Sequence, residues 1–347
     1  PTRTARRIPK LQSSPDFFKS PFSRALDFFS LICYNKFNYY SKGLIVLEQE
    51  VFEWKEEYEI GVAEIDRAHK QLFSIVNRII NNFMDMDFEK NKMTCMEAIK
   101  YLKSYTIKHF AEEEAYQCSI NYGGYKVHKK IHDNMRDVVI PALEKEVTAK
   151  SYSKEALEHF VGACAGWLAA HVLVEDQAIT GKTRSKWTAN VVDEDNREDT
   201  LDAIVKNYIK GLFRMNAQLI NKNYNGYELT KPFCYTDTFT TPNGDTFSVV
   251  SAVEESVLQI IALKFFKESV FVMDGVMSSM LSEMLKSFNM EVMMAFLNNS
   301  LSNTQSRIMS NADFYKLFET VYPDYTMLWR TEYGYIAFCI KKRPVQQ

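Results

Sequence analysis

The chain lacks a cysteine pattern and a strong net charge, and each absence excludes a class of protein. Its six cysteines are scattered over 347 residues with no CxxC pair, which argues against a disulfide framework or a thiolate zinc site and indicates reduced thiols in a cytoplasm. The 42 basic and 44 acidic residues give a net charge of −2, so no overall charge attracts nucleic acid. We therefore expect a cytoplasmic protein without a nucleic-acid partner.

The N-terminal segment, residues 1–44, differs from the rest. Its first 43 residues carry eight Lys or Arg against two acidic residues, which predicts a basic, disordered segment. A transit peptide and a truncated or mistranslated upstream stretch both remain open interpretations, and we assign it no function. The apolar run 25–33 is too short to span a bilayer, so no membrane partner is expected.

Histidine is scarce, but its placement is the most informative feature of the chain. Five of the six histidines fall in a fixed order with two carboxylates: His69, His109, Glu113, His128, His132, His171 and Asp176. Residues four apart lie about 40° apart around a helix, so HFAEE and HKKIH each direct two donors to one place. The intervals of 40, 19 and 43 residues between successive groups suit four antiparallel helices joined by short loops. Imidazole and carboxylate together predict a two-metal site for iron, manganese or zinc.

The alternative is that these histidines are ordinary surface or core residues. A single HxxxH is as often a solvated face as a site, but that explanation requires four coincidences here. His159 belongs to no pair and is expected to be structural or at the surface. His171 and Asp176 are five residues apart, about 140° on a regular helix, so we predict a local π-bulge or a helix end near Asp176.

The chain length and the periodicity predict two domains. Helical periodicity over 65–84, 92–117, 125–147 and 154–179 predicts an all-α, up-down four-helix bundle within residues 45–181. A polar linker is expected over 182–197, before a second domain over 198–347. There, a helix over 198–223, a hairpin of 233–241 and 246–253, helices over 255–267 and 274–299 and a hairpin of 325–332 and 335–342 predict an α+β fold.

The donor motifs resemble those of the bacterial hemerythrins over about residues 52–181. The likeness lies in Trp54, GVAEIDRAH (61–69), HFAEEE (109–114) and WLAAHVLVED (167–176). It implies two iron ions in an oxo- or hydroxo-bridged centre with dioxygen as the ligand. By resemblance, one iron is held by three imidazoles, those of His128, His132 and His171. The other iron is held by two imidazoles and keeps an open position; its ligands are His69 and His109. Two carboxylates bridge the irons, those of Glu113 and Asp176.

A hemerythrin-like centre needs an apolar pocket, because water would release bound oxygen and leave the site oxidised. Trp167 lies four residues before His171 and so on the same helical face, with Leu168 beside it. Ordinary core packing is the alternative for both. The WLxxH pattern that resembles the family favours Trp167 and Leu168 as oxygen-pocket residues.

The second half resembles the CheC and CheX type of chemotaxis phosphatase over about residues 198–342. In that type, an ExxN motif on a long helix faces phosphorylated CheY. The best placement puts Glu283 at the glutamate and Lys286 where asparagine is expected, which removes the amide that positions the attacking water. A solvated helix face is the alternative for this pair. We expect a non-catalytic docking or dimerisation module, whose Met-rich helix 274–299 is either an adaptable contact surface or core.

These expectations combine into a non-haem diiron protein that senses oxygen or redox state and signals to chemotaxis through a CheX-like domain. The expected partners are dioxygen, a CheY-type response regulator and a second copy of the chain. Two alternatives stay open: storage or scavenging of oxygen or iron with an oligomerising second half, and a CheY phosphatase with an oxygen-sensing input. The missing amide favours a protein that is not an enzyme.

Overall fold

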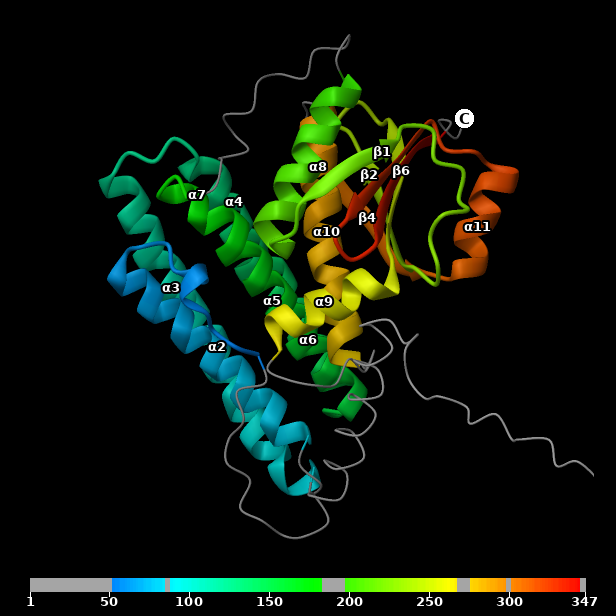
Figure 1. Ribbon diagram of the computed structural model, residues 1–347. Helices are drawn as coiled ribbons and strands as arrows, with labels where there is room; N and C mark the ends of the chain where they lie inside the picture. The colour runs from blue at the N-terminus through cyan, green and yellow to red at the C-terminus, as the bar shows by residue number, and fades with distance from the viewer. Residues whose placement is uncertain (1–51, 85–87, 183–196, 267–274, 298–300, 344–347) are drawn as a thin grey trace, which may run out of the picture. The chain divides into compact units, whose positions relative to one another are not determined.

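The computed structural model describes residues 52–84, 88–182, 197–266, 275–297 and 301–343 (Figure 1). All of them belong to one compact unit, Leu47–Gln347. The predicted N-terminal segment lies outside the described residues, as does the predicted linker apart from its two end residues. The domain boundaries therefore stay predictions.

The first half is the predicted all-α bundle of four helical segments, preceded by the short helix η1 (Glu56–Tyr58). Their buried positions recur at helical spacing, as in Leu72, Val76 and Ile79 on the first segment, so each segment buries one face against the others. Ser153 caps the fourth segment by accepting a hydrogen bond from the Ala156 amide. The segments are α2 (Ala63–Met84); α3 (Phe88–Ser119); α4 (Tyr125–Asn134), η2 (Met135–Val139) and α5 (Ile140–Ala149); and α6 (Lys154–Ala170), η3 (His171–Asp176) and α7 (Gln177–Ile179).

The fourth segment widens where the donor spacing predicts it. Residues His171–Asp176 form the π-helix η3, whose looser winding brings residues five apart closer to one face than a regular helix does. The predicted π-bulge is confirmed. A second π-helical stretch, η2, has no counterpart in the sequence predictions.

The second half is α+β, as predicted, and is built on a six-stranded antiparallel sheet in the order β1-β5-β6-β3-β2-β4. Both predicted hairpins are present. The predicted helix over 198–223 is too long, because the chain turns into a strand at Ala217. The final strand-helix pair before the second hairpin was not predicted. The elements are α8 (Arg197–Phe213), β1 (Ala217–Asn221), β2 (Phe233–Thr240), β3 (Thr246–Val253), α9 (Glu255–Phe265), α10 (Gly275–Leu297), β4 (Ser302–Met309), α11 (Asn311–Thr320), β5 (Tyr325–Thr331) and β6 (Tyr335–Arg343).

Alternate residues of the strands face two separate cores. Trp329 and Phe338 belong to the larger core, with side chains of α8, α9 and α10. Leu328 and Cys339 belong to the smaller core, with Phe314 of α11. The period of two along each strand thus places α10 and α11 on opposite faces of the sheet.

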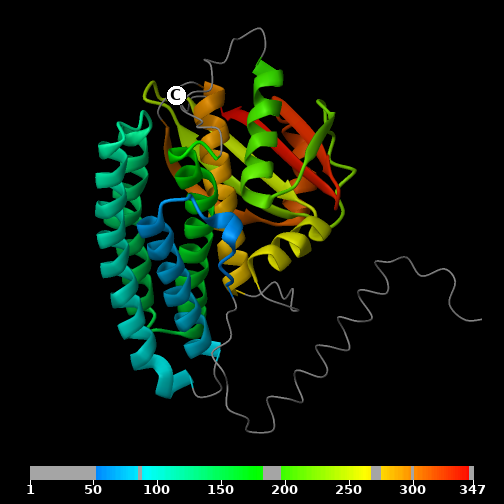
Figure 2. The same cartoon turned by 60° about the vertical axis from the view of Figure 1, so that its left-hand side comes forward.

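The larger core is continuous between the bundle and the sheet, because α6 packs along α10. Figures 1 and 2 show the green α6 beside the orange α10. Among the residues that the structure describes, one helix, 154–179, is long and apolar enough to cross a membrane, but 78% of its apolar 18-residue window is buried inside the protein. The apolar composition of this helix is therefore explained by its burial among neighbours on several sides.

Two glycines allow α6 and α10 to approach closely. A Cβ at Gly162 would collide with the Val276 carbonyl, and one at Gly166 would collide with the Met280 carbonyl and lie 3.0 Å from the Met280 Cα. Small residues four apart form a groove that admits a neighbouring backbone. The α6–α10 contact is thus a backbone-to-backbone approach that larger side chains would prevent.

Candidate metal centre

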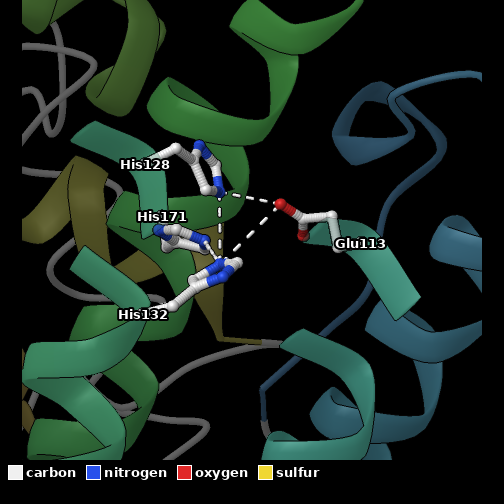
Figure 3. A group of neighbouring side chains, drawn as sticks. All are labelled: Glu113, His128, His132 and His171. Atoms are coloured by element: carbon white, nitrogen blue, oxygen red, sulfur yellow. Dashed lines mark hydrogen bonds and ion pairs between the residues drawn. The ribbon is translucent and has the colours of Figure 1, made fainter. Parts of the chain in front are cut away.

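One group of donors gathers inside the bundle from three helical segments (Figure 3). It consists of Glu113 on α3, His128 and His132 on α4, and His171 at the start of η3, all buried. The His132 Nε2 lies 2.9 Å from the His171 Nε2 and 3.2 Å from the His128 Nε2. The His128 Nε2 lies 2.7 Å from Glu113 Oε1. Three imidazole nitrogens and a carboxylate oxygen therefore converge on one point.

A second group lies on the other side of Glu113. It adds His69 of α2 and His109 of α3, whose ring centres are 4.7 Å apart. The His109 Nε2 lies 3.4 Å from Glu113 Oε2, and the His69 Nε2 lies 3.9 Å from the same oxygen. Each oxygen of Glu113 thus faces a different group of imidazoles.

Asp176 also lies between the two groups. Its Oδ2 is 3.1 Å from the His69 Nε2, and its Oδ1 is 3.0 Å from the His171 Nε2. The π-helical winding of η3 accounts for this arrangement, because it brings Asp176 toward the face that carries His171. The structure therefore brings together all seven residues that the spacing singled out.

Burial and proximity set the charges of the site. Burial and the Asp176 carboxylate act to raise the pKa of Glu113, but the hydrogen bond and charge of His128 outweigh them and hold it below its ordinary value. Burial acts against ionisation of Asp176 too, yet His171 and His69 keep its pKa well below the usual range. Both carboxylates are ionised.

The pKa values of His109, His132 and His128 are shifted in different directions. Burial lowers the pKa of His109 to about 4, and burial together with His171 and His128 lowers the pKa of His132. For His128, burial is outweighed by Glu113, which raises the pKa to about 9. His109 and His132 are neutral at pH 7, the state in which imidazole donates a lone pair to a metal.

These donors fit a pair of metal ions. In the described part of the chain, Glu113 Oε2 is buried and has no hydrogen-bond donor, an arrangement that leaves a desolvated anionic oxygen unsatisfied. A cation between Glu113 and the His69–His109 pair would satisfy it. Nitrogen and carboxylate oxygen are donors that iron accepts readily.

Two residues that contact the donor side chains, Glu114 and Gln117, were not predicted from the sequence. Glu114 places Oε1 3.2 Å from the His132 Nδ1, and Gln117 donates from Nε2 to Glu113 Oε1 at 2.7 Å. Helical spacing was an available signal for Gln117, since it lies one turn after Glu113. Glu114 is adjacent in sequence to a donor, but its partner is on another helix.

Aromatic rings cover the histidines of the first group. Trp167 stacks on His171, with ring centres 4.3 Å apart and planes 15° apart, and Phe110 stacks on His132 at 3.9 Å and 6°. Leu168 is buried in the core. The assignment of Trp167 and Leu168 to an oxygen pocket stays a prediction.

The remaining residues from the sequence predictions are His159, the pair Glu283 and Lys286, and the methionines of α10. His159 is about half exposed and pairs with Glu146 at 2.8 Å, as expected for a surface residue. Lys286 lies 3.3 Å from Glu283 Oε1 on α10. Four methionines of α10 are buried, so this part of its Met-rich face is core: Met277, Met280, Met284 and Met293.

A helical bundle with buried imidazoles and carboxylates from all four segments is a metal-binding domain. The model of the hemerythrin HHE cation-binding domain matches residues 60–182. Bacteriohemerythrin of Clostridium acetobutylicum is 34% identical over 133 residues, which are 37% of this chain and 97% of that protein. A hemerythrin of Sipunculus nudus is 29% identical over 100 residues, 28% of this chain and 75% of the relative. The chain belongs to the hemerythrin family.

Among solved structures, the chemotaxis protein CheX from Vibrio vulnificus is similar in fold. The alignment covers 42% of this chain and 99% of that one, at 10% identity and a TM-score of 0.32. The hemerythrin match leaves the part of the chain after residue 182 unaccounted for.

Proposed function

We propose that this protein binds dioxygen at a two-iron centre and that the state of the centre regulates the second half of the chain. The observation that carries the proposal is the double role of the fourth helical segment. That segment holds His171 and Asp176 at one end of its sequence and packs through Gly162 and Gly166 against α10. A change at the donors therefore occurs in the helix that touches the second domain.

The chain supplies two unequal sets of donors. His128, His132 and His171 would hold one iron, and the two-histidine set would hold the other. Glu113 and Asp176 face both sets and would be shared. Two irons held by these donors would supply one electron each for reversible binding of dioxygen. The set with one imidazole fewer leaves room for a small ligand.

The surrounding side chains exclude water from the donors. Trp167 and Phe110 lie face to face with His171 and His132, and Leu168 is 5% exposed. Apolar walls slow the access of water and of the protons it carries. Trp167 and Phe110 cover the three-histidine set, and Phe110 also reaches the two-histidine set, because its ring centre lies 5.9 Å from that of His109. Such walls would favour reversible binding over rapid oxidation of the site.

The regulated element is α10, whose residues are all buried or half-buried in the structure. Gly166 of α6 lies against Met280 and Glu283 of α10, and the next residue, Trp167, stacks on His171. A shift of His171 would thus reach α10 through two neighbouring residues. A packed interface responds to such shifts in a two-state manner rather than gradually.

The output is proposed to be docking of a CheY-type response regulator in the cytoplasm, or pairing with a second copy. Both would use the α10 face that carries Glu283. Since α6 now covers that face, docking there requires α6 to move. Oxygen-dependent movement of α6 would then control access. Simple oxygen storage would not need this contact.

The experiment is an anaerobic titration of purified protein. Iron analysis is expected to give two irons per chain, and adding oxygen to the ferrous protein is expected to produce a new visible absorption band that vanishes when oxygen is removed. Replacing His69 by alanine removes one of two imidazoles from the open set and should abolish the band. His159→Ala, a surface change, should leave the band intact. One metal per chain, or equal behaviour of the two variants, would overturn the assignment.

A further inference from the structure

Gln117 is a fully buried amide one helical turn beyond Glu113 on α3. Its Nε2 donates to Glu113 Oε1 at 2.7 Å. The other end of the amide, Oε1, has no hydrogen-bond partner among the described residues. The side chain thus makes one strong contact and leaves one polar atom unsatisfied.

The orientation of the amide follows from its partner. A carboxylate oxygen accepts hydrogen bonds, so the N–H end of the Gln117 amide faces Glu113 Oε1. An unsatisfied buried oxygen costs about 1–3 kcal/mol, whereas an apolar side chain such as methionine would fill similar space without that cost. Local choices that lower stability are typical of functional sites.

We infer that Gln117 is a positioning residue that holds the shared carboxylate and weakens it as a metal donor. The inference rests on the proposed two-iron centre. Glu113 has a flexible side chain whose two oxygens must face different imidazole sets. The hydrogen bond from Gln117 fixes the Oε1 end, which leaves Oε2 directed at His109.

The same hydrogen bond alters the electronic character of Glu113. An N–H draws electron density from the oxygen to which it donates, so a carboxylate that accepts it gives less to a metal. A weaker anionic donor stabilises the ferrous state relative to the ferric state, because the ferric ion gains more from negative charge. Gln117 therefore favours the reduced form, the form that binds dioxygen.

The test compares Gln117→Met with a control at another buried amide. Asn77 of α2 lies about two helical turns after His69 and exchanges hydrogen bonds with the Phe52 backbone, so Asn77→Leu reports the effect of losing a buried amide. Cobalt(II) or iron(II) is titrated into metal-free protein against a competing chelator. Loss of an outer partner typically lowers metal affinity about 10- to 100-fold. This loss is expected for Gln117→Met, because the freed carboxylate loses its fixed orientation and that loss outweighs its gain in donor strength, but it is not expected for Asn77→Leu.

The second measurement is the midpoint potential of the iron-loaded protein. Gln117→Met is expected to lower it, since Glu113 becomes a stronger donor, while Asn77→Leu leaves it unchanged. Metal-free unfolding temperatures identify any variant that has lost its fold. If wild-type protein does not bind two irons, the proposed function fails. If it does, but Gln117→Met keeps both affinity and potential, only the role of Gln117 is refuted.

Discussion

The contact between α6 and α10 predicts the sign of a single substitution, Gly166→Ala. In an isolated helix this change stabilises by roughly 0.5–1 kcal/mol, because alanine loses less backbone freedom on folding. Here the new Cβ would collide with the Met280 carbonyl and would lie 3.0 Å from the Met280 Cα and 3.1 Å from the Glu283 Cβ, where ordinary contact is 3.4–4 Å. The two helices must therefore move apart.

Overpacking of this kind typically costs about 1–3 kcal/mol, which exceeds the gain in helix propensity. Gly166→Ala should thus destabilise the protein. Gly211 of α8 is the matched control, because its Cβ would meet nothing closer than 3.9 Å. Gly211→Ala should stabilise by roughly 0.5–1 kcal/mol.

The assay is thermal unfolding of both variants in the same metal state, followed by circular dichroism and by tryptophan fluorescence. A change of 1 kcal/mol shifts the melting temperature by about 2–4 °C in proteins of about 150–250 residues, and by less in a larger protein such as this one. Opposite shifts for Gly166→Ala and Gly211→Ala are expected. Equal stabilisation by both would refute close packing of α6 on α10, and with it the proposed route between the domains.

Further predictions concern the pocket and the second domain. Trp167→Ser or Leu168→Ser should admit water and shorten the lifetime of the oxygenated protein, while iron content stays at two per chain; an unchanged autoxidation half-life in both would remove them from the pocket. Full-length protein should not accelerate phosphate release from a phosphorylated CheY-type regulator, since Lys286 pairs with Glu283 and offers no amide to orient water; rapid release would restore the enzyme interpretation.

The convergence of the seven candidate donors was predictable because they follow helical geometry. Each pair of donors lies within one helical segment, so the spacing along the sequence determines whether the two side chains share a face. This holds for the i,i+4 pairs His109–Glu113 and His128–His132 and for the wider spacing of His171 and Asp176. Even the π-helix could be inferred, because two donors on one segment must reach one place. The spacing could not predict a contact between a donor and a residue on another helix, such as the one between His132 and Glu114.

The second domain was predicted less completely, and for physical reasons. β4 is an edge strand with mostly exposed residues, so it lacks the apolar alternation by which strands are identified. β1 is also an edge strand and is five residues long. No proline or glycine stands between the end of α8 and the start of β1 to mark the change from helix to strand. The pairing of α6 with α10 joins residues more than a hundred positions apart, and Gly162 and Gly166 alone do not identify their partner.

The central claim is that the state of the metal centre reaches α10, and hydrogen exchange of α10 tests it most directly. Exchange should be compared between anaerobic ferrous protein and the same protein after oxygen is added, with α11 as the control on the opposite face of the sheet. A coupling of about 1 kcal/mol corresponds to about a fivefold change in protection. We expect such a change in α6 and α10 and none in α11. Unchanged exchange in α10, with oxygen binding confirmed by absorption, would contradict it.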